Sequence, residues 1–311
     1  ARPGRVRARP RRPGAAAAGA ADHAFVMTDI SFDCMGTTVR LIVSDEATAL
    51  ACQEFLQDFD RELSRFRPDS ELSRLNADPR TEVEASALLR SAISAGLMAA
   101  ELTNGLIDPT LTPALEANGY DRTRRDPELP LQEALRHAPP RHPATGTSAY
   151  ASITVTDHSI RRPPGVRFDT GGLGKGLAVD MLALRLNGGA WAIDAGGDMR
   201  VSGTYPVEVR HPLTQQTIKT LQLTNQAVAT SGIDRRLWRA PDGSPRHHLL
   251  DPATQRPAWT GVIGATALAP TATEADTLAK AALLSGPDAA ARWLRRHGGL
   301  FITDDGTVID V

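Results

Sequence analysis

The chain has little cysteine, few aromatic residues and no excess of either charge. Its 311 residues include only Cys34 and Cys52, too few for a disulfide framework and not clustered as zinc ligands are. Basic and acidic residues number 35 and 36, so the chain as a whole has no general attraction for nucleic acid or an anionic membrane. No apolar run approaches the length of a transmembrane helix. We therefore expect no nucleic-acid partner and no transmembrane segment.

The remaining composition is that of a globular protein with an unusual N-terminus. Hydrophobic residues make up 41% of the chain and charged residues 23%. Residues 1–24 are rich in arginine, proline and alanine, which predicts a disordered tail without the apolar core of a signal peptide. Residues 25–311 are predicted to form one large domain.

Helical and strand-like patterns are mixed along this domain. Helical spacing of apolar residues is found in 46–66, 85–105, 176–187 and 287–296, and Thr271 is a candidate helix cap. Strand-like runs flank Gly36 and recur in 190–203, 227–232 and 299–306. Residues 121–148, rich in Pro, Arg and His, are expected to form a surface excursion. Because strands and helices do not alternate steadily, we predict an α+β fold with mixed or antiparallel sheets and packed helices.

A glycine-rich stretch, "GGLGKG" at 171–176, lies between a predicted strand and a predicted helix. A P-loop would need Gly at 169 and a hydroxyl at 176, where the chain has Asp169 and Gly176. The glycine spacing also differs from that of the dinucleotide fingerprint. Glycines and a helix N-terminus still favour an anion, and Lys175 adds a full positive charge. The alternative is a tight turn with a solvated lysine.

Eight polar motifs follow one another along the chain. They are "MGT" at 35, "FRPDSELSRLN" at 66, "TNGLIDPTLTP" at 103, "FDTGGLGKGLAVD" at 168, "DAGGD" at 194, "ATSG" at 229, "HHLLDP" at 247 and "EADTLAK" at 274. This ordered series resembles the ApbE family of FAD:protein FMN transferases. The resemblance extends from about residue 34 to residue 286. It implies an ApbE-like single domain that splits FAD with Mg²⁺, attaches FMN to a Thr or Ser hydroxyl of an acceptor flavoprotein, and releases AMP.

The resemblance also implies roles for individual residues. The positions that match FAD-binding segments of the family are Met35, Phe66, Thr103, Asn104, Gly105, Asp169, Lys175, Thr230, Ser231 and Asp251. The carbonyl of Gly172 and the carboxylate of Asp276 match Mg²⁺ ligands, in keeping with the preference of this ion for oxygen. His248 and Asp180 are candidates for the catalytic base from residue type.

Two positions depart from the family pattern. Lys280 stands where the family has a Thr or Ser that helps to hold Mg²⁺, and an ammonium has no lone pair to offer a metal. Gln255 replaces a Gly that is expected to serve a turn with positive φ. The departure at Lys280 leaves open a relative that binds FAD with little transfer. A second alternative is an FAD pyrophosphatase that forms FMN and AMP, since the same site can support hydrolysis by water.

Simple structural roles also remain open for several of these residues. His248 is about as well explained as a packing or capping side chain, and Asp251 as a turn former. Asp276 and Lys280 have the spacing of a simple surface pair. Arg67, Asp69, Glu71 and Asn76 are expected to form a structural hydrogen-bond cluster rather than to contact a ligand. For location, "ISFD" before Cys34 lacks the character of a lipobox, so we expect a cytoplasmic protein, with the cell envelope as the alternative.

Overall fold

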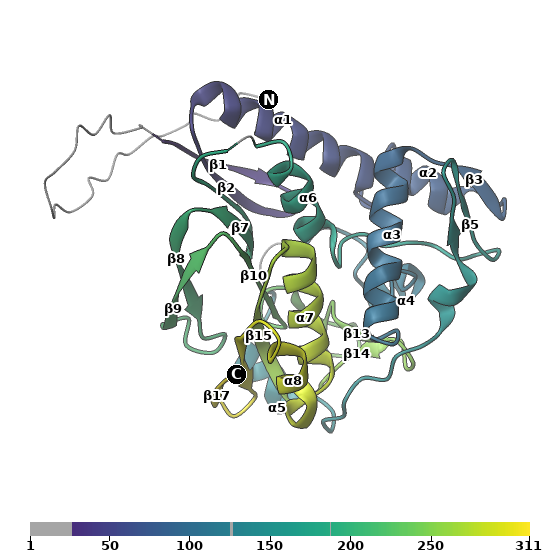
Figure 1. Ribbon diagram of the computed structural model, residues 1–311. Helices are drawn as coiled ribbons and strands as arrows, with labels where there is room; N and C mark the ends of the chain where they lie inside the picture. Colours follow the sequence, from purple (N-terminus) through teal and green to yellow (C-terminus); the bar gives the residue numbers. More distant parts are fainter. Residues whose placement is uncertain (1–26, 125–126, 187) are drawn as a thin grey trace, which may run out of the picture.

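The structure, a computed structural model, describes residues 27–124, 127–186 and 188–311 (Figure 1). The predicted tail, residues 1–24, lies outside the described residues. Within them, no helix combines the length and the apolar character that crossing a membrane requires. Both cysteines are buried and free, as expected from the sequence.

An eight-stranded sheet, in the order β1-β2-β6-β7-β10-β15-β16-β17, forms the centre of the fold. Every neighbouring pair in it is antiparallel. The strands are β1 (Thr28–Cys34), β2 (Thr37–Val43), β6 (Trp191–Ala195), β7 (Asp198–Ser202), β10 (Ala227–Gly232), β15 (Val262–Ala269), β16 (Gly299–Thr303) and β17 (Val308–Asp310). The predicted strand run 190–203 is divided into β6 and β7, because Gly196 and Gly197 form a turn with positive φ.

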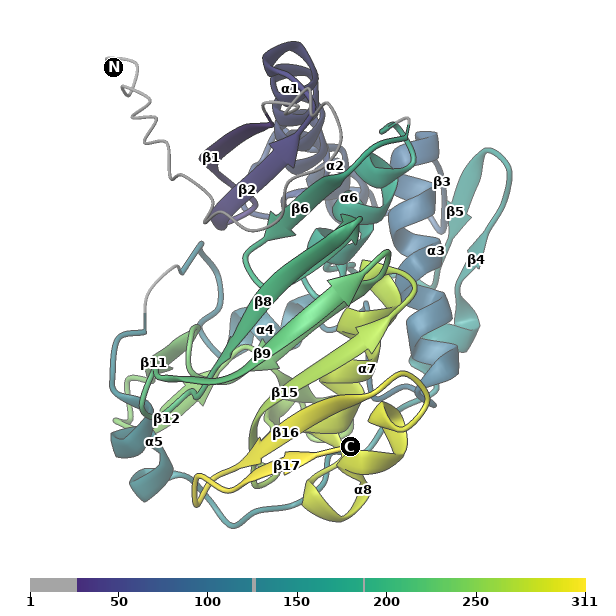
Figure 2. The ribbon, with the colours of Figure 1, turned by 60° about the vertical axis from the view of Figure 1, so that its left-hand side comes forward.

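The two faces of this sheet are covered by different elements. In β10, Ala227 and Ala229 belong to the main core cluster, whereas Val228 faces a smaller cluster on the other side. The main core lies under α1 (Glu46–Leu63), α6 (Gly174–Ala183) and α7 (Ala272–Leu284). The opposite face is covered by the hairpin of β8 (Thr204–Arg210) and β9 (Thr217–Thr224), which lies in front of the sheet in Figure 2 while α7 lies behind it.

Polar side chains cap several helix starts, and the cap predicted at Thr271 is confirmed. Thr271 accepts a hydrogen bond from the amide of Glu274 at the start of α7. Ser70 does the same for Ser73 at the start of α2 (Glu71–Ala77), and Ser86 for Leu89 at the start of α3 (Ala87–Leu102). Such side chains satisfy amide groups that a helix leaves unpaired.

The remaining elements surround the core, and one of them differs from expectation. They are β3 (Glu82–Glu84), α4 (Thr112–Ala117), α5 (Leu131–His137), η1 (Ala149–Ser152), β4 (Thr154–Val155), β5 (Ser159–Arg161), β11 (Leu237–Arg239), β12 (Pro245–His247), β13 (Leu250–Asp251), β14 (Arg256–Pro257) and α8 (Pro287–Leu294). Within the predicted surface excursion, Leu129, Leu131 and Ala134 are buried in the main core. The segment 121–148 is therefore partly internal, which its polar composition did not indicate.

Candidate active site

A cavity of about 710 Å³ opens where the ends of β1, β2 and β10 meet the start of α6 and one side of α7. This volume suits a ligand of the size of a nucleotide cofactor. Its wall also takes residues from the C-terminal end of α1 and from the segments 64–67, 106–111 and 248–250. Residues from positions 33 to 284 of the chain are thus brought together around one cavity.

The β1–β2 turn places Met35 in the cavity wall. Cys34 pairs with Thr37, so Met35 and Gly36 are the two central residues of the hairpin turn. Both have positive φ, 52° and 68°, as the tight turns favoured in hairpins require. A methionine is rarely found in this conformation, and strain of this kind often accompanies a functional site. Met35 therefore lies where the resemblance implied a ligand contact.

The glycine-rich stretch forms another part of the wall, and α6 begins at Gly174 within it. Asp169 accepts a hydrogen bond from the amide of Gly171 at 3.1 Å and forms an ion pair with Arg65, with an N–O distance of 3.2 Å. A Cβ atom added to Gly172 would meet no heavy atom within 4 Å among the described residues. This backbone is therefore open to a ligand, as expected for an anion-binding loop.

Asp180 holds two helices together and does not line the cavity. Its carboxylate accepts hydrogen bonds from the amides of Ala272 and Thr273 at 2.9 and 2.8 Å, and from the Thr273 hydroxyl at 2.7 Å. Arg200 donates a further bond at 2.9 Å. A carboxylate at the start of α7 also stabilises the helix dipole. Asp180 therefore fixes the start of α7, and its role as a base stays a prediction from residue type.

Two residues of α7, Asp276 and Lys280, reach the cavity as a buried ion pair. The Lys280 ammonium donates a hydrogen bond to Oδ1 of Asp276, and the Ser231 hydroxyl donates to the same oxygen at 3.4 Å. Oδ2 of Asp276 is buried and has no hydrogen-bond partner among the described residues. The alternative of a simple surface pair is thereby contradicted, since the two side chains are only 1% and 10% exposed.

A second ammonium–carboxylate pair, Lys175 and Asp198, lies beside the first. The Lys175 ammonium contacts Oδ2 of Asp198, whose side chain is 1% exposed. Burial, together with the negative charge of Asp276, raises the pKa of Asp198 to about 6. Burial opposes the charge of Lys175, but the carboxylates of Asp198 and Asp276 outweigh this effect and raise the lysine's pKa. The solvated-lysine alternative for Lys175 is therefore contradicted.

His248 lines the cavity with a half-buried ring. Its Nδ1 atom is buried without a hydrogen-bond partner among the described residues. Loss of water contact and then the nearby charge of Arg236 lower the pKa of His248 well below its usual value. The neutral imidazole is thus the stable form near pH 7, and this form can accept a proton.

Aromatic and guanidinium groups form a wall of the cavity that the motifs only partly indicated. Phe66 packs edge-on against Tyr120, with 5.6 Å between the ring centroids. The guanidinium carbon of Arg65 lies 4.2 Å from the centroid of Phe66 and 4.8 Å from that of Tyr120. Arg236 lines the cavity as well. Arg236 belongs to the run "DRRLWR" at 234–239, a pattern that is more typical of a solvated or acceptor-docking surface than of a ligand site.

The predicted nucleotide-binding stretch 103–105 is not part of the cavity wall. Thr103 is buried; its hydroxyl donates to the carbonyl of Ala99 at 2.7 Å and accepts from the amide of Ile107 at 3.1 Å. Asn104 and Gly105 have positive φ and form the turn after α3. A Cβ at Gly105 would lie 1.7 Å from the carbonyl oxygen of Thr147. The stretch shapes a turn against a neighbouring chain segment, and its contact with the nucleotide stays a prediction from the resemblance.

The "HHLLDP" and "DPATQRP" motifs form a turn beside the cavity. Asp251 accepts hydrogen bonds from the amides of Thr145 and Ala253 and from the hydroxyl of Thr254, at 3.0 to 3.1 Å. It does not line the cavity, and its contacts are those of the turn-forming alternative, so its contact with FAD stays a prediction from the resemblance. Gln255 has a φ of 57°, so this position does require positive φ, as the departure from Gly led us to expect.

Thr230, Ser231 and a polar network near α2 complete the set of predicted residues. Thr230 and Ser231 both line the cavity, and the Thr230 hydroxyl lies 2.9 Å from that of Thr266.

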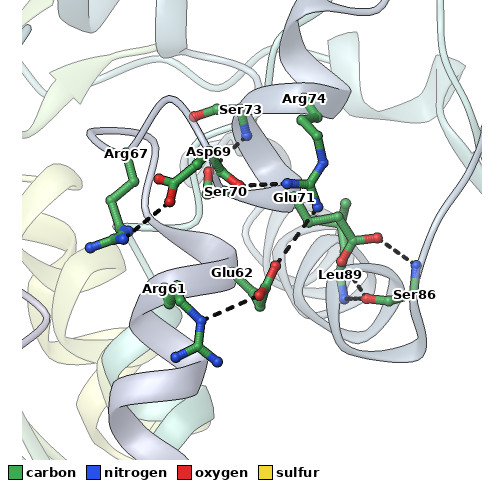
Figure 3. A network of polar contacts seen from close by, with 10 residues as sticks. All are labelled: Arg61, Glu62, Arg67, Asp69, Ser70, Glu71, Ser73, Arg74, Ser86 and Leu89. Atoms are coloured by element: carbon green, nitrogen blue, oxygen red, sulfur yellow. Dashed lines mark hydrogen bonds and ion pairs between the residues drawn. The ribbon is translucent and has the colours of Figure 1, made fainter.

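Figure 3 shows the predicted structural cluster: Arg67 contacts Asp69, and Glu71 binds the amide and hydroxyl of Ser86. Asn76 instead bonds both backbone groups of Phe168, at 2.7 and 2.8 Å. Arg67 also reaches the cavity wall.

Comparisons with known proteins all point to one family. The model of the ApbE family matches residues 35–302. The FAD:protein FMN transferase of Treponema pallidum is 30% identical over 281 residues, which cover 81% of this chain and 76% of the relative. That of Haemophilus influenzae is 26% identical over 285 residues, covering 84% and 81%. The crystal structure of the ApbE protein of Thermotoga maritima superposes with a TM-score of 0.75 at 28% identity, covering 91% of this chain and 96% of that one.

Proposed function

This chain belongs to the ApbE family, and we propose that it is an FAD:protein FMN transferase that moves FMN from FAD to a Thr or Ser hydroxyl of an acceptor flavoprotein. The names of its relatives support the flavin transfer. The fold is the antiparallel α+β fold of the family's solved structures.

The cavity itself carries the proposal. Lys175, Lys280 and Arg236 offer positive charge in one space, beside open glycine backbone at Gly172. Phe66 and Tyr120 line the same space. A pyrophosphate needs cations and amide donors, whereas an isoalloxazine ring needs flat apolar surface. FAD contains both a pyrophosphate and an isoalloxazine ring, and this cavity offers a suitable surface for each.

The transfer of FMN to a hydroxyl requires few protein groups. The acceptor oxygen attacks the phosphorus of the FMN half, the bond between that phosphorus and the bridging oxygen breaks, and AMP leaves with that oxygen. The hydroxyl proton must go to a base, for which we propose the imidazole of His248, since it lines the cavity and is neutral. Lysine ammonium groups would stabilise the charge that develops on the phosphate oxygens.

The Mg²⁺ that the family resemblance implies does not fit the donor set as it stands. Oδ2 of Asp276 is a buried oxygen without a partner among the described residues, which suits a hard cation. However, the other oxygen is bonded by the Lys280 ammonium, which repels a cation and offers no lone pair. Nor do the described residues contain a cluster of three or more His, Cys, Asp or Glu placed to hold a metal. We derive no step through Mg²⁺.

The test is transfer to an acceptor. Mass spectrometry of a Thr-containing acceptor flavoprotein incubated with this protein and FAD should show covalent addition of FMN, together with AMP release. His248→Gln should slow transfer at least tenfold, as loss of a general base does, while FAD binding persists. Absence of addition with FAD and added Mg²⁺ would refute the transferase.

One observation favours a second candidate. The Lys280–Asp276 pair fits a protein that holds FAD without transferring FMN, because the ammonium is bonded to the carboxylate that a catalytic metal would use. Bound FAD without AMP release would identify that case. The cytoplasmic location stays a prediction from the sequence, which cell fractionation would test.

A further inference from the structure

We propose that the Lys280 ammonium takes the place of a divalent cation in this cavity, so that FAD is bound through its pyrophosphate without any metal. This inference rests on the proposed function only for the identity of the ligand.

The distribution of lysine in the chain supports this proposal. The chain contains 35 lysine and arginine residues, of which only Lys175, Lys219 and Lys280 are lysines. Two of these three line the cavity, and the third forms a surface ion pair with Asp310. Lysine carries a compact point charge, whereas arginine is a broad planar fork. In a chain that otherwise uses arginine, lysine is thus found where a small cation is useful.

The geometry places the Lys280 charge where Asp276 would otherwise hold a metal. Lys280 is one helical turn after Asp276 on α7, so both side chains lie on the same face of the helix. The start of α7 is fixed by Thr271 and by the carboxylate of Asp180, which binds the amides of Ala272 and Thr273. The helix that carries Lys280 is therefore fixed at its start by its own cap and by Asp180 of α6, and the ammonium itself is held by Asp276.

The free-energy cost of burying the Lys280–Asp276 ion pair also indicates a function for it. A buried ion pair is often no more stabilising than apolar residues of the same volume. Both members of this pair are at least 90% buried, yet both line an open cavity rather than the core. An ammonium has three protons, and Oδ1 of Asp276 accepts one of them. The others remain available for phosphate oxygens.

The first measurement is FAD affinity of the intact protein, from flavin fluorescence, in chelator and in excess Mg²⁺. We expect the wild type to bind FAD equally in both. Lys280→Met should bind about tenfold more weakly in both, the loss that corresponds to one charge-assisted hydrogen bond. Lys280→Thr, which offers a hydroxyl to a metal, should bind weakly in chelator and regain about tenfold in Mg²⁺. Lys219→Met is the matched control and should behave as the wild type.

A direct metal readout completes the test. Titration of Mn²⁺ followed by electron paramagnetic resonance should detect no bound ion at this site in the wild type and one in Lys280→Thr. Loss of FAD affinity by the wild type in chelator, or tight Mn²⁺ binding to it, overturns the proposal. If Lys280→Met does not fold, these wild-type measurements still decide it.

The outcomes separate this inference from the proposed function. Metal-independent FAD binding without FMN transfer leaves Lys280 as the cation and refutes the transferase. FMN transfer that stops in chelator refutes the role of Lys280 and keeps the transferase. Failure to bind FAD under either condition refutes both.

Discussion

Two regions of this molecule are rich in paired charges, and they use them differently. In the cavity, the pairs Lys280–Asp276 and Lys175–Asp198 are almost fully buried. In the network between α1 and α2, Arg74 and Glu62 are 61% and 36% exposed, with 3.9 Å between their nearest N and O atoms (Figure 3). Both regions contain polar motifs of similar appearance in the sequence.

The difference lies in what each charge would lose if its partner were removed. An exposed pair is solvated in any case and contributes roughly 0 to 1 kcal/mol. A buried charge without its partner costs several kcal/mol, so a buried pair is held as a unit. Charge pairs in the cavity wall are thus fixed in position, which suits a site that must hold phosphate oxygens. Four predictions test this contrast.

The largest effect is expected at Asp198. Asp198→Ala leaves the Lys175 ammonium without its nearest counter-charge, and we expect a loss of about 3 to 5 kcal/mol in the free energy of unfolding. Urea unfolding at pH 7 measures it. The double change Asp198→Ala with Lys175→Met should lose less than Asp198→Ala alone. Equal losses would mean that the two charges do not act as a unit.

The next largest effect is a loss of stability at acidic pH, which we expect from His247. His247, beside the cavity residue His248, is buried, and burial lowers its pKa to about 3. The unfolded chain binds a proton at this residue near pH 6.5 and the folded chain does not, so stability falls as the pH falls below 6.5. We expect this residue to contribute a loss of about 2 kcal/mol between pH 6.5 and 5, at 1.36 kcal/mol per pH unit.

Urea unfolding at both pH values compares the wild type with His247→Phe, which keeps a ring against Trp259. The variant should lose less stability on acidification, whereas replacing the exposed His158 by Ala should leave the loss unchanged. An unchanged loss in His247→Phe would assign the acid sensitivity to other groups.

Local signals predicted much of the fold, and long-range contacts decided the site. Caps such as Thr271 and the turn at Gly36 act within a few residues, so the sequence displays them directly. Asp180 binds α7 from 92 and 93 residues away, a contact that no local pattern contains. Arg65 and Tyr120 meet in the cavity wall from separate segments. Polar motifs therefore indicated much of the cavity wall, but only the packing separated cavity-lining residues from turn formers such as Asp251.

A smaller effect is expected outside both regions, at the turn that contains Gln255. Its φ of 57° is unfavourable for a residue with a Cβ atom. Gln255→Gly should stabilise the protein by about 1 kcal/mol, the usual cost of a left-handed residue that is not glycine. FAD affinity should not change, because Gln255 does not line the cavity. Thermal unfolding with and without FAD provides the measurement, and a fall in stability would contradict the strain.

The smallest effect is expected in the exposed network, where Glu62 contacts Arg61 and Arg74. Glu62→Gln removes the charge and keeps the shape, so the free energy of unfolding should fall by less than about 0.5 kcal/mol, and less still in high salt. Urea unfolding at two salt concentrations measures this. The result bears on the cavity too, because Asp60 and Leu63 of the same helix line it. A loss above 1 kcal/mol, or weaker FAD binding, would show that α1 couples the two regions and that exposure alone does not separate them.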